Sequence, residues 1–198
     1  MKNIISSVIL AFLLFSFVSS NAQSTKNPNK KVTIGLLVDG AIIGQPLPEG
    51  VKYYPILIQG NFRFPLLRNE SRNQLTIQFQ PQVNPVIIRG IENTSAVELG
   101  VTFGLAYERL VKSENGIFYI GISISPHAIS YETARQANGF IFSDNLHIGY
   151  HQILGNGKWM VSYQLKGRHL SNGGRQAPNN GINNLLVGVG ISRMLGKN

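Results

Sequence analysis

The alternation of side chains over residues 159–171 decides the fold. The stretch reads Trp159-Met160-Val161-Ser162-Tyr163-Gln164-Leu165-Lys166-Gly167-Arg168-His169-Leu170-Ser171. In an extended chain, side chains at positions i and i+2 point to the same side. The odd positions up to 165 therefore form an apolar stripe, and the even positions are mostly polar. His169 and Ser171 continue the apolar stripe with an imidazole and a hydroxyl, which packing alone does not require.

The same period of two recurs along the chain. Eight segments show it, at residues 32–38, 54–64, 75–79, 97–107, 118–124, 140–150, 159–171 and 185–191. Their opposite faces carry Gly, Ser, Thr, Gln and Asn, and charged residues make up only 14% of the chain, against about a quarter in typical soluble domains. We therefore expect an all-β fold, an eight-stranded antiparallel transmembrane β-barrel with its apolar face outward and small polar side chains in a narrow lumen. A soluble lipocalin-like carrier is the alternative.

The connections between these segments alternate in length. Those at 66–72, 112–115 and 155–157 are short, whereas those at 39–51, 81–95, 126–138 and 172–181 are longer. Short periplasmic turns and longer extracellular loops alternate in this way in outer-membrane barrels. The strand at 159–171 follows a short turn, so its end at Ser171 is expected to lie towards the outer leaflet.

The first 22 residues have the features of an export signal. Lys2 gives a charged start, residues 4–18 are mainly apolar, and Ser20-Asn21-Ala22 offers small residues for cleavage, so we expect a signal peptide over residues 1–22. A membrane-anchor helix is the alternative, but the apolar run is short for one. Residues 23–198 then form a single outer-membrane β-barrel domain.

Composition narrows the class of partner. The chain has no cysteine, which excludes disulfides, and its formal net charge of +9 suits an anionic surface. It shows no recognition motif for nucleic acid, which we do not expect as a partner. Lipopolysaccharide is the anionic component expected in the outer leaflet, where the strand at 159–171 is expected to end, and a homodimer stays open.

A hydroxyl beside an imidazole in a water-poor place is the minimum for nucleophilic acyl transfer, because the imidazole takes the proton as the oxygen attacks. A third group should orient the imidazole. Pairing across loop 172–181 brings Asn183 roughly opposite Ser171, facing lipid. Pairing about the turn at 155–157 puts Asp144 near His169, also facing lipid, where a charge is costly and usually has a reason. An interfacial ion pair with Arg168 is the other interpretation of Asp144.

Two runs of sequence carry a resemblance to a known family. They are His169-Leu170-Ser171-Asn172-Gly173-Gly174 and Pro178-Asn179-Asn180-Gly181-Ile182-Asn183. With the glycine-interrupted last strand they resemble the PagL-type lipid A deacylases, a family also described as acyloxyacyl hydrolases, over roughly residues 97–195. The resemblance implies an eight-stranded outer-membrane barrel whose serine hydrolase site faces the bilayer and releases the ester-linked 3-O acyl chain of lipid A, without metal or other cofactor.

The resemblance also implies roles for single residues. Ser171 would be the nucleophile and His169 the general base, while three residues would stabilise the oxyanion, namely Asn172, Gly174 and Asn179. The acid of the family corresponds to Asn183 here. Either the amide suffices, or Asp144 substitutes for it, or the protein has little activity. The competing function is a non-enzymatic barrel for adhesion or envelope stability, in which the His-Ser pair is vestigial.

Other polar residues have simpler interpretations. Arg135, Arg168 and Arg175 lie near the expected outer rim, where they are candidates for contact with the phosphates of lipid A, with ordinary interfacial arginines as the alternative. His147 and His151 share the lumenal side of one segment. No carboxylate accompanies them, so hydrogen bonding is a better interpretation than a metal site.

Overall fold

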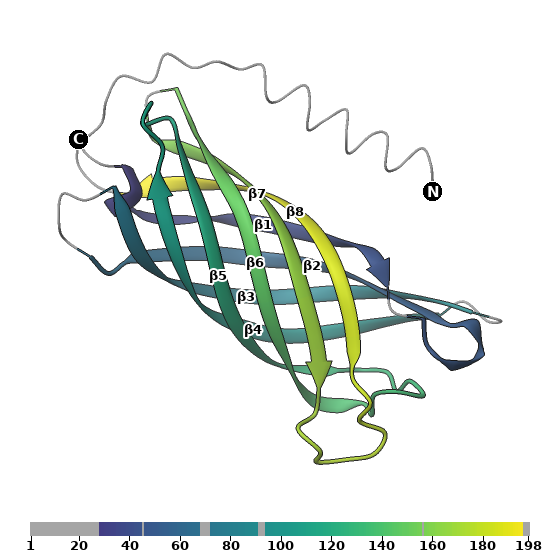
Figure 1. The fold of residues 1–198 in the computed structure, drawn as a ribbon. Helices are drawn as coiled ribbons and strands as arrows, with labels where there is room; N and C mark the ends of the chain where they lie inside the picture. Colours follow the sequence, from purple (N-terminus) through teal and green to yellow (C-terminus); the bar gives the residue numbers. More distant parts are fainter. Residues whose placement is uncertain (1–27, 45, 68–71, 91–93, 156, 196–198) are drawn as a thin grey trace.

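The protein is a closed barrel. The computed structural model describes residues 28–44, 46–67, 72–90, 94–155 and 157–195, and these form eight antiparallel strands, each paired with its sequence neighbours, with β8 closing onto β1 (Figure 1). The strands are β1 (Val32–Gly44), β2 (Lys52–Pro65), β3 (Asn73–Arg89), β4 (Thr94–Leu110), β5 (Gly116–Ile129), β6 (Gly139–Leu154), β7 (Trp159–Ser171) and β8 (Ile182–Leu195). The expected eight-stranded antiparallel barrel is confirmed. The expected signal peptide lies outside the described residues.

The two ends of the barrel differ. We call the end with the β1–β2, β3–β4, β5–β6 and β7–β8 connections the loop end, and the end where β1 begins and β8 finishes the turn end. In Figure 1 the β7–β8 connection is the yellow-green loop at the bottom. Two short 3-10 helices, η1 (Pro28–Lys30) and η2 (Pro48–Gly50), precede β1 and β2. Neither of the helices in the described ranges has the length or apolar character needed to span a membrane.

The strands of the first half are longer than the sequence indicated. The expected loop at 81–95 is wrong, because β3 continues to Arg89 and β4 begins at Thr94. Pro81 and Pro85 lie inside β3. The pairing of β3 with β4 is continuous across both prolines, whereas its pairing with β2 is interrupted opposite each of them. Proline has no N–H group, and both prolines therefore interrupt only the edge of β3 that faces β2. The edge that faces β4 stays paired.

The other expected loops changed less. The loops expected at 39–51 and 126–138 shorten to 45–51 and 130–138, since β1 and β5 run further, and the loop at 172–181 is as predicted. Short and long connections therefore alternate only from β4 onward.

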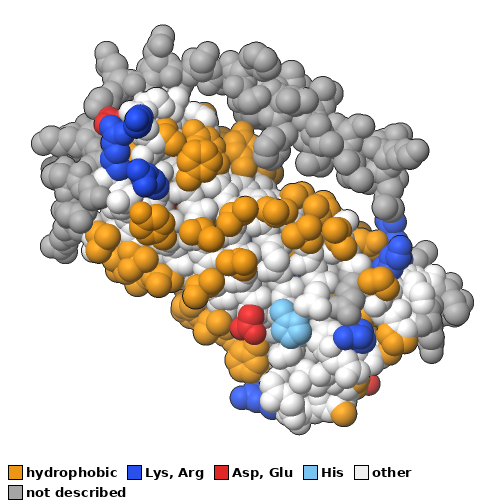
Figure 2. Space-filling view, in the orientation of Figure 1, with side chains coloured by type: hydrophobic (Ala, Val, Ile, Leu, Met, Phe, Trp, Pro, Cys, Tyr) orange, Lys and Arg blue, Asp and Glu red, His pale blue; other side chains and the backbone are white. Residues whose placement is uncertain are grey.

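Large apolar side chains cover the outside of the barrel. On β5, four of them are between 50% and 62% exposed, namely Phe118, Ile120, Ile122 and Ile124. The alternate residues of β5 point inward and are buried. Figure 2 shows the apolar side chains as a broad belt across the face drawn, with Lys and Arg towards the ends of the molecule. An apolar belt of this extent is typical of a surface that faces lipid.

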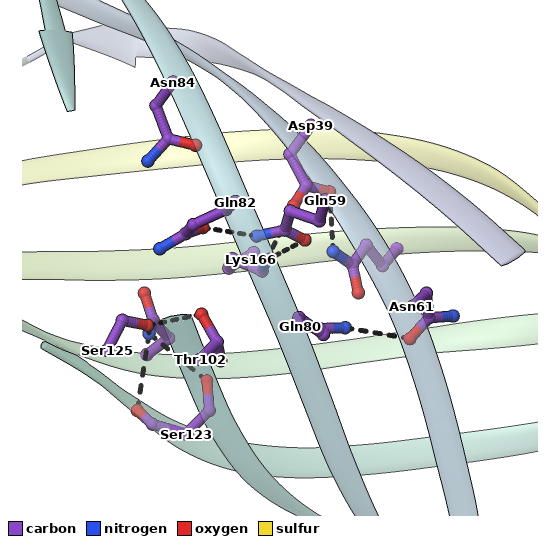
Figure 3. Close-up of polar contacts among 12 residues, drawn as sticks. Asp39, Gln59, Asn61, Gln80, Gln82, Asn84, Thr102, Ser123, Ser125 and Lys166 are labelled. Carbon is purple, nitrogen blue, oxygen red and sulfur yellow. Dashed lines mark hydrogen bonds and ion pairs between the residues drawn. The ribbon is translucent and has the colours of Figure 1, made fainter. Parts of the chain in front are cut away.

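Polar side chains fill the middle of the barrel (Figure 3). Amides bond in pairs, Gln59 to Gln82 at 2.8 Å and Gln80 to Asn61 at 3.1 Å. Apolar clusters close both ends. The turn-end cluster contains Leu110, Ile117, Ile153, Met160 and Met194. The loop-end cluster contains Leu47, Tyr53, Val86, Ile88, Ala96, Ile129, Ile141, Leu170 and Ile182. These amides therefore bond to one another in place of the water they lose.

Candidate active site

His169 and Ser171 are the last outward-facing residues of β7, at the loop end. Their neighbours are fixed inside the barrel, since Arg168 forms an ion pair with Glu98 and Leu170 belongs to the loop-end cluster. Because alternate residues of a strand face opposite sides, this anchoring turns both His169 and Ser171 outward. His169 is exposed and Ser171 is half-buried. The imidazole and the hydroxyl therefore share the outer surface of the barrel.

Asn183 on β8 orients the imidazole. Nδ1 of His169 lies 2.7 Å from Oδ1 of Asn183. An amide oxygen only accepts hydrogen bonds, so in the neutral imidazole Nδ1 carries the proton and Nε2 the lone pair. A lone pair on Nε2 is what a general base needs. The predicted register is wrong by two residues: Asn183 lies opposite His169 and not Ser171, because β8 begins at Ile182, opposite Leu170.

A carboxylate lies on the other side of the same imidazole. Asp144 on β6 is the register partner of His169, and its side chain is exposed on the outer surface. Figure 2 shows an acidic side chain beside the histidine on this face. His169 thus lies between an amide on β8 and a carboxylate on β6. Among the described residues its hydrogen bond goes to the amide, and no ion pair joins it to Asp144.

The hydroxyl of Ser171 is engaged with its own loop. Ser171 Oγ accepts a hydrogen bond from the Gly173 N–H at 3.3 Å. Within the described part of the chain, no hydrogen bond joins Ser171 to His169. Residues two apart on a strand are separated by about 6.6 Å along its axis, so contact between Oγ and Nε2 depends on the rotamers of both side chains.

Gly181 packs directly against the imidazole. A Cβ atom at residue 181 would lie 2.6 Å from Cε1 and 3.2 Å from Nε2 of His169, and the φ angle of Gly181 is +67°. Both the contact and the left-handed backbone favour glycine. This role of Gly181 was not predicted, although Gly181 belongs to the run that carries the family resemblance. Sequence spacing cannot show that a loop glycine reaches a strand side chain.

The residues expected to stabilise an oxyanion build the β7–β8 loop. Asn172 is buried; its N–H donates to Asn179 Oδ1 at 2.8 Å and its side-chain Nδ2 donates to Gln176 O at 2.6 Å. The Gly174 N–H donates to Asn172 Oδ1 at 3.0 Å. Asn172 therefore uses its backbone N–H and one of its two side-chain N–H groups within the loop, and its expected role as an oxyanion donor stays a prediction that rests on the remaining N–H. The Gly174 N–H thus donates to a side-chain oxygen and not to a backbone carbonyl.

The three arginines have different surroundings. Arg168 is only 3% exposed and donates to Glu98 inside the barrel, so the expectation that it contacts lipid A phosphates is wrong. Arg175 is exposed in the β7–β8 loop, with its guanidinium 5.1 Å from the ring centroid of Phe140 and 5.4 Å from that of Phe142. Phe142 is the register partner of Ser171. Arg175 therefore lies over the register partner of the serine.

Arg135 does not point to the surroundings of the barrel. Its Nε donates to Gly181 O at 2.8 Å and its Nη2 donates to Asn180 O at 2.6 Å. Two of its five guanidinium N–H donors are thus used by backbone carbonyls of the β7–β8 loop, and its expected role towards phosphate groups stays a prediction.

The lumenal histidines are held apart by an aromatic ring. Tyr119 stacks on His151 at a centroid distance of 4.2 Å and lies 5.9 Å from His147. His151 Nδ1 is 2.8 Å from Ser162 Oγ. Over the described ranges, no three His, Asp or Glu side chains gather as a metal site requires.

A groove of about 890 Å³ runs over the outer surface beside the site. His169, Asn183 and Asp144 line one part of it. Apolar side chains of the neighbouring strands line the rest, among them Ile77, Phe103, Leu105, Ile122 and Leu146. Gly167 also lines the groove, where its missing side chain leaves open space on β7. The groove thus joins the polar side chains of His169, Asn183 and Asp144 to an apolar surface.

Two solved structures of outer membrane proteins resemble this fold. The outer membrane enzyme PagL has a similar structure, with a TM-score of 0.57 and 18% identity over 80% of this chain and 97% of that chain. The outer membrane protein OprG from Pseudomonas aeruginosa has a TM-score of 0.50 and 10% identity, over 84% and 95% of the two chains. These likenesses concern the fold. No match was found among curated proteins.

A family model described as lipid A 3-O-deacylase (PagL) matches residues 59–192. The matched segment is more than half of the chain and contains all the site residues described above. The chain belongs to the lipid A 3-O-deacylase (PagL) family.

Proposed function

We propose that this protein is an outer-membrane serine esterase that hydrolyses an ester-linked acyl chain of lipid A. Ser171 is the nucleophile and His169 the general base. One observation carries the proposal: the 2.7 Å hydrogen bond from His169 Nδ1 to Asn183 Oδ1, which leaves Nε2 unprotonated on a surface that faces lipid. Residues 1–22 would be the export signal, and the loop end would lie at the outer leaflet.

The reaction needs only groups of this chain and water. Ser171 Oγ attacks the ester carbonyl carbon while its proton moves to His169 Nε2. The sugar oxygen then leaves with that proton, which gives an acyl group on Ser171. Water attacks the acyl-enzyme, its proton again passes to Nε2, and the fatty acid departs as the serine regains its proton.

The β7–β8 loop would stabilise the oxyanion. The Gly174 N–H is bonded to Asn172 Oδ1, and we propose that the oxyanion replaces this side-chain acceptor. The amide nitrogen of Asn179 would supply a second donor, because the oxygen of that amide already accepts from the Asn172 N–H. Asn172 would hold the loop through its bonds to Asn179 and Gln176, with one side-chain N–H left for the oxyanion.

The substrate would lie along the groove. Its acyl chain would contact the apolar side chains that line the groove, and the anionic head group would approach Arg175 at the rim. The ester carbonyl, between chain and head group, would then meet Ser171. This arrangement fits a lipid with phosphate near a sugar ester, as in lipid A.

Mass spectrometry of lipid A tests the proposal. Cells that express the wild type should contain lipid A lacking one acyl chain, and cells that express Ser171→Ala should retain it. Loss of a catalytic serine typically lowers the rate by at least about 10³-fold. Ser113→Ala is the matched control, because it removes a hydroxyl in an exposed residue at the turn end and should behave as wild type.

Identical lipid A from wild-type and Ser171→Ala cells would refute the esterase. The non-enzymatic barrel, for adhesion or envelope stability, would then be the better account. The amide at residue 183 favours that alternative, because it supplies no negative charge to the imidazole.

A further inference from the structure

We propose that Arg135, in the β5–β6 connection, is a positioning residue for His169. It would fix the end of the β7–β8 loop and, through Gly181, the plane of the imidazole. This inference rests on the proposed function, because it concerns the same site.

Three hydrogen bonds join Arg135 to the end of the β7–β8 loop. Its Nε donates to Gly181 O at 2.8 Å, its Nη2 donates to Asn180 O at 2.6 Å, and its own carbonyl accepts from the Asn180 N–H at 2.7 Å. A guanidinium presents its donors in a rigid planar fork. Two neighbouring carbonyls are therefore held in one fixed geometry.

The residues after Arg135 extend this contact into a short ladder. Gln136 forms a β-bridge with Asn179, and the Ala137 N–H donates to Pro178 O at 2.8 Å. Gln136 and Ala137 are fully buried. The Thr133 hydroxyl accepts the Gln136 N–H at 3.0 Å, which closes a turn and presents Arg135 to the neighbouring loop. The two loops thus form one unit at the loop end (Figure 1).

This unit controls two parts of the site. Gly181, whose carbonyl Arg135 holds, packs on Cε1 and Nε2 of His169. Asn179, bridged to Gln136, accepts the N–H of Asn172, the residue next to Ser171. A shift of the loop would move the imidazole and the segment after the serine together. Small misplacements of this kind lower catalytic rates strongly.

Kinetics of the purified full-length protein in detergent test the inference. The variants are Arg135→Ala and Arg135→Lys, and the substrates are phosphorylated lipid A and an uncharged short-chain ester. Arg135→Ala should lower kcat about 10- to 100-fold on both substrates, with little change in KM. Millimolar guanidinium should restore part of the loss, and Arg135→Lys should lose less than Arg135→Ala. Lys52→Ala removes a cation in an exposed residue at the loop end and should match wild type within about twofold.

Two results would overturn the inference. One is wild-type kinetics for Arg135→Ala. The other is a loss confined to the phosphorylated substrate or to KM, which would make Arg135 a substrate contact. Folding is judged by the heat-dependent gel mobility of a folded barrel. If Arg135→Ala does not fold, the same two results for Arg135→Lys would overturn the inference. A wild type inactive on both substrates would instead refute the proposed esterase.

Discussion

At residue 183 the protein has an amide where a serine triad usually has an acid. The amide oxygen holds the imidazole tautomer but adds no charge to stabilise the imidazolium. A hydrogen bond to a carboxylate is about twice as strong as one to a neutral acceptor. A gain of about 1.4 kcal/mol corresponds to a tenfold change in rate. Asn183→Asp should therefore raise kcat about tenfold on an ester substrate in detergent.

Asp144→Asn is the matched test of the other flank of His169. If Asn183 orients the imidazole, Asp144→Asn should keep kcat within about threefold of wild type, since no hydrogen bond among the described residues is lost. A drop of about 100-fold or more in Asp144→Asn, with no gain in Asn183→Asp, would make Asp144 the acid.

Gly181 gives a second residue-scale prediction. Gly181→Ala should lower kcat about 100-fold, because the new Cβ would lie 2.6 Å from His169 Cε1 and force the ring away from Asn183. Gly50→Ala is the control, since Gly50 has a φ of +72° with nothing within 4 Å of an added Cβ. Each substitution should cost about 1–2 kcal/mol of folding free energy from backbone strain. Equal activity of the two variants would contradict the role of Gly181.

At the scale of elements, β7 presents the candidate active site on its outer side and contacts the barrel interior on its inner side. Its outward residues include the proposed catalytic pair His169 and Ser171, while Lys166 and Arg168 hold its inward side through ion pairs with Asp39 and Glu98. Glu98 also accepts hydrogen bonds from Tyr53 and Asn84. The outer position of His169 therefore depends on charges on the opposite face of the sheet.

Removing Glu98 should destabilise the barrel. Glu98→Ala leaves a buried guanidinium unpaired, which typically costs about 3–5 kcal/mol. Urea unfolding in lipid vesicles, followed by the fluorescence of the single tryptophan, measures this free energy. Glu132→Ala, in an exposed residue of the β5–β6 connection, should change it by no more than about 0.5 kcal/mol. A similar small change for both variants would show that the ion pair contributes little.

Strand periodicity predicts some elements better than others. The outward face of β7 follows directly from its alternation, because side-chain direction has a strict period of two. The course of β3 does not, since prolines usually mark loops and their tolerance here depends on which neighbour loses the hydrogen bond. The contacts of Arg135 and Gly181 join loops distant in sequence, and no local pattern encodes them. The outward position of His169, Ser171 and Asn183 on a barrel could be predicted, but the loop contacts around them could not.

At the scale of the whole molecule, the length of β7 indicates how deep in the membrane the site lies. Trp159 and Ser171 are its two ends. Their separation is about 40 Å along the strand at about 3.3 Å per residue, and a tilt of about 40° reduces this to about 30 Å across the membrane. The hydrocarbon core has about the same thickness. If Trp159 lies at one interface, Ser171 lies at the other, among the head groups and ester bonds.

Fluorescence quenching by brominated lipids tests this placement in reconstituted vesicles. Trp159 should be quenched most by bromines near the head groups, because it is an exposed aromatic residue at the turn end of the belt. The comparison variant places tryptophan at Leu165 in a Trp159→Phe background. Leu165 is an outward-facing residue in the middle of β7, so its tryptophan should be quenched most by bromines near the bilayer centre. Strong quenching of either tryptophan by aqueous iodide alone would contradict a membrane-spanning β7 and would place the serine in water, where a lipid ester could not reach it.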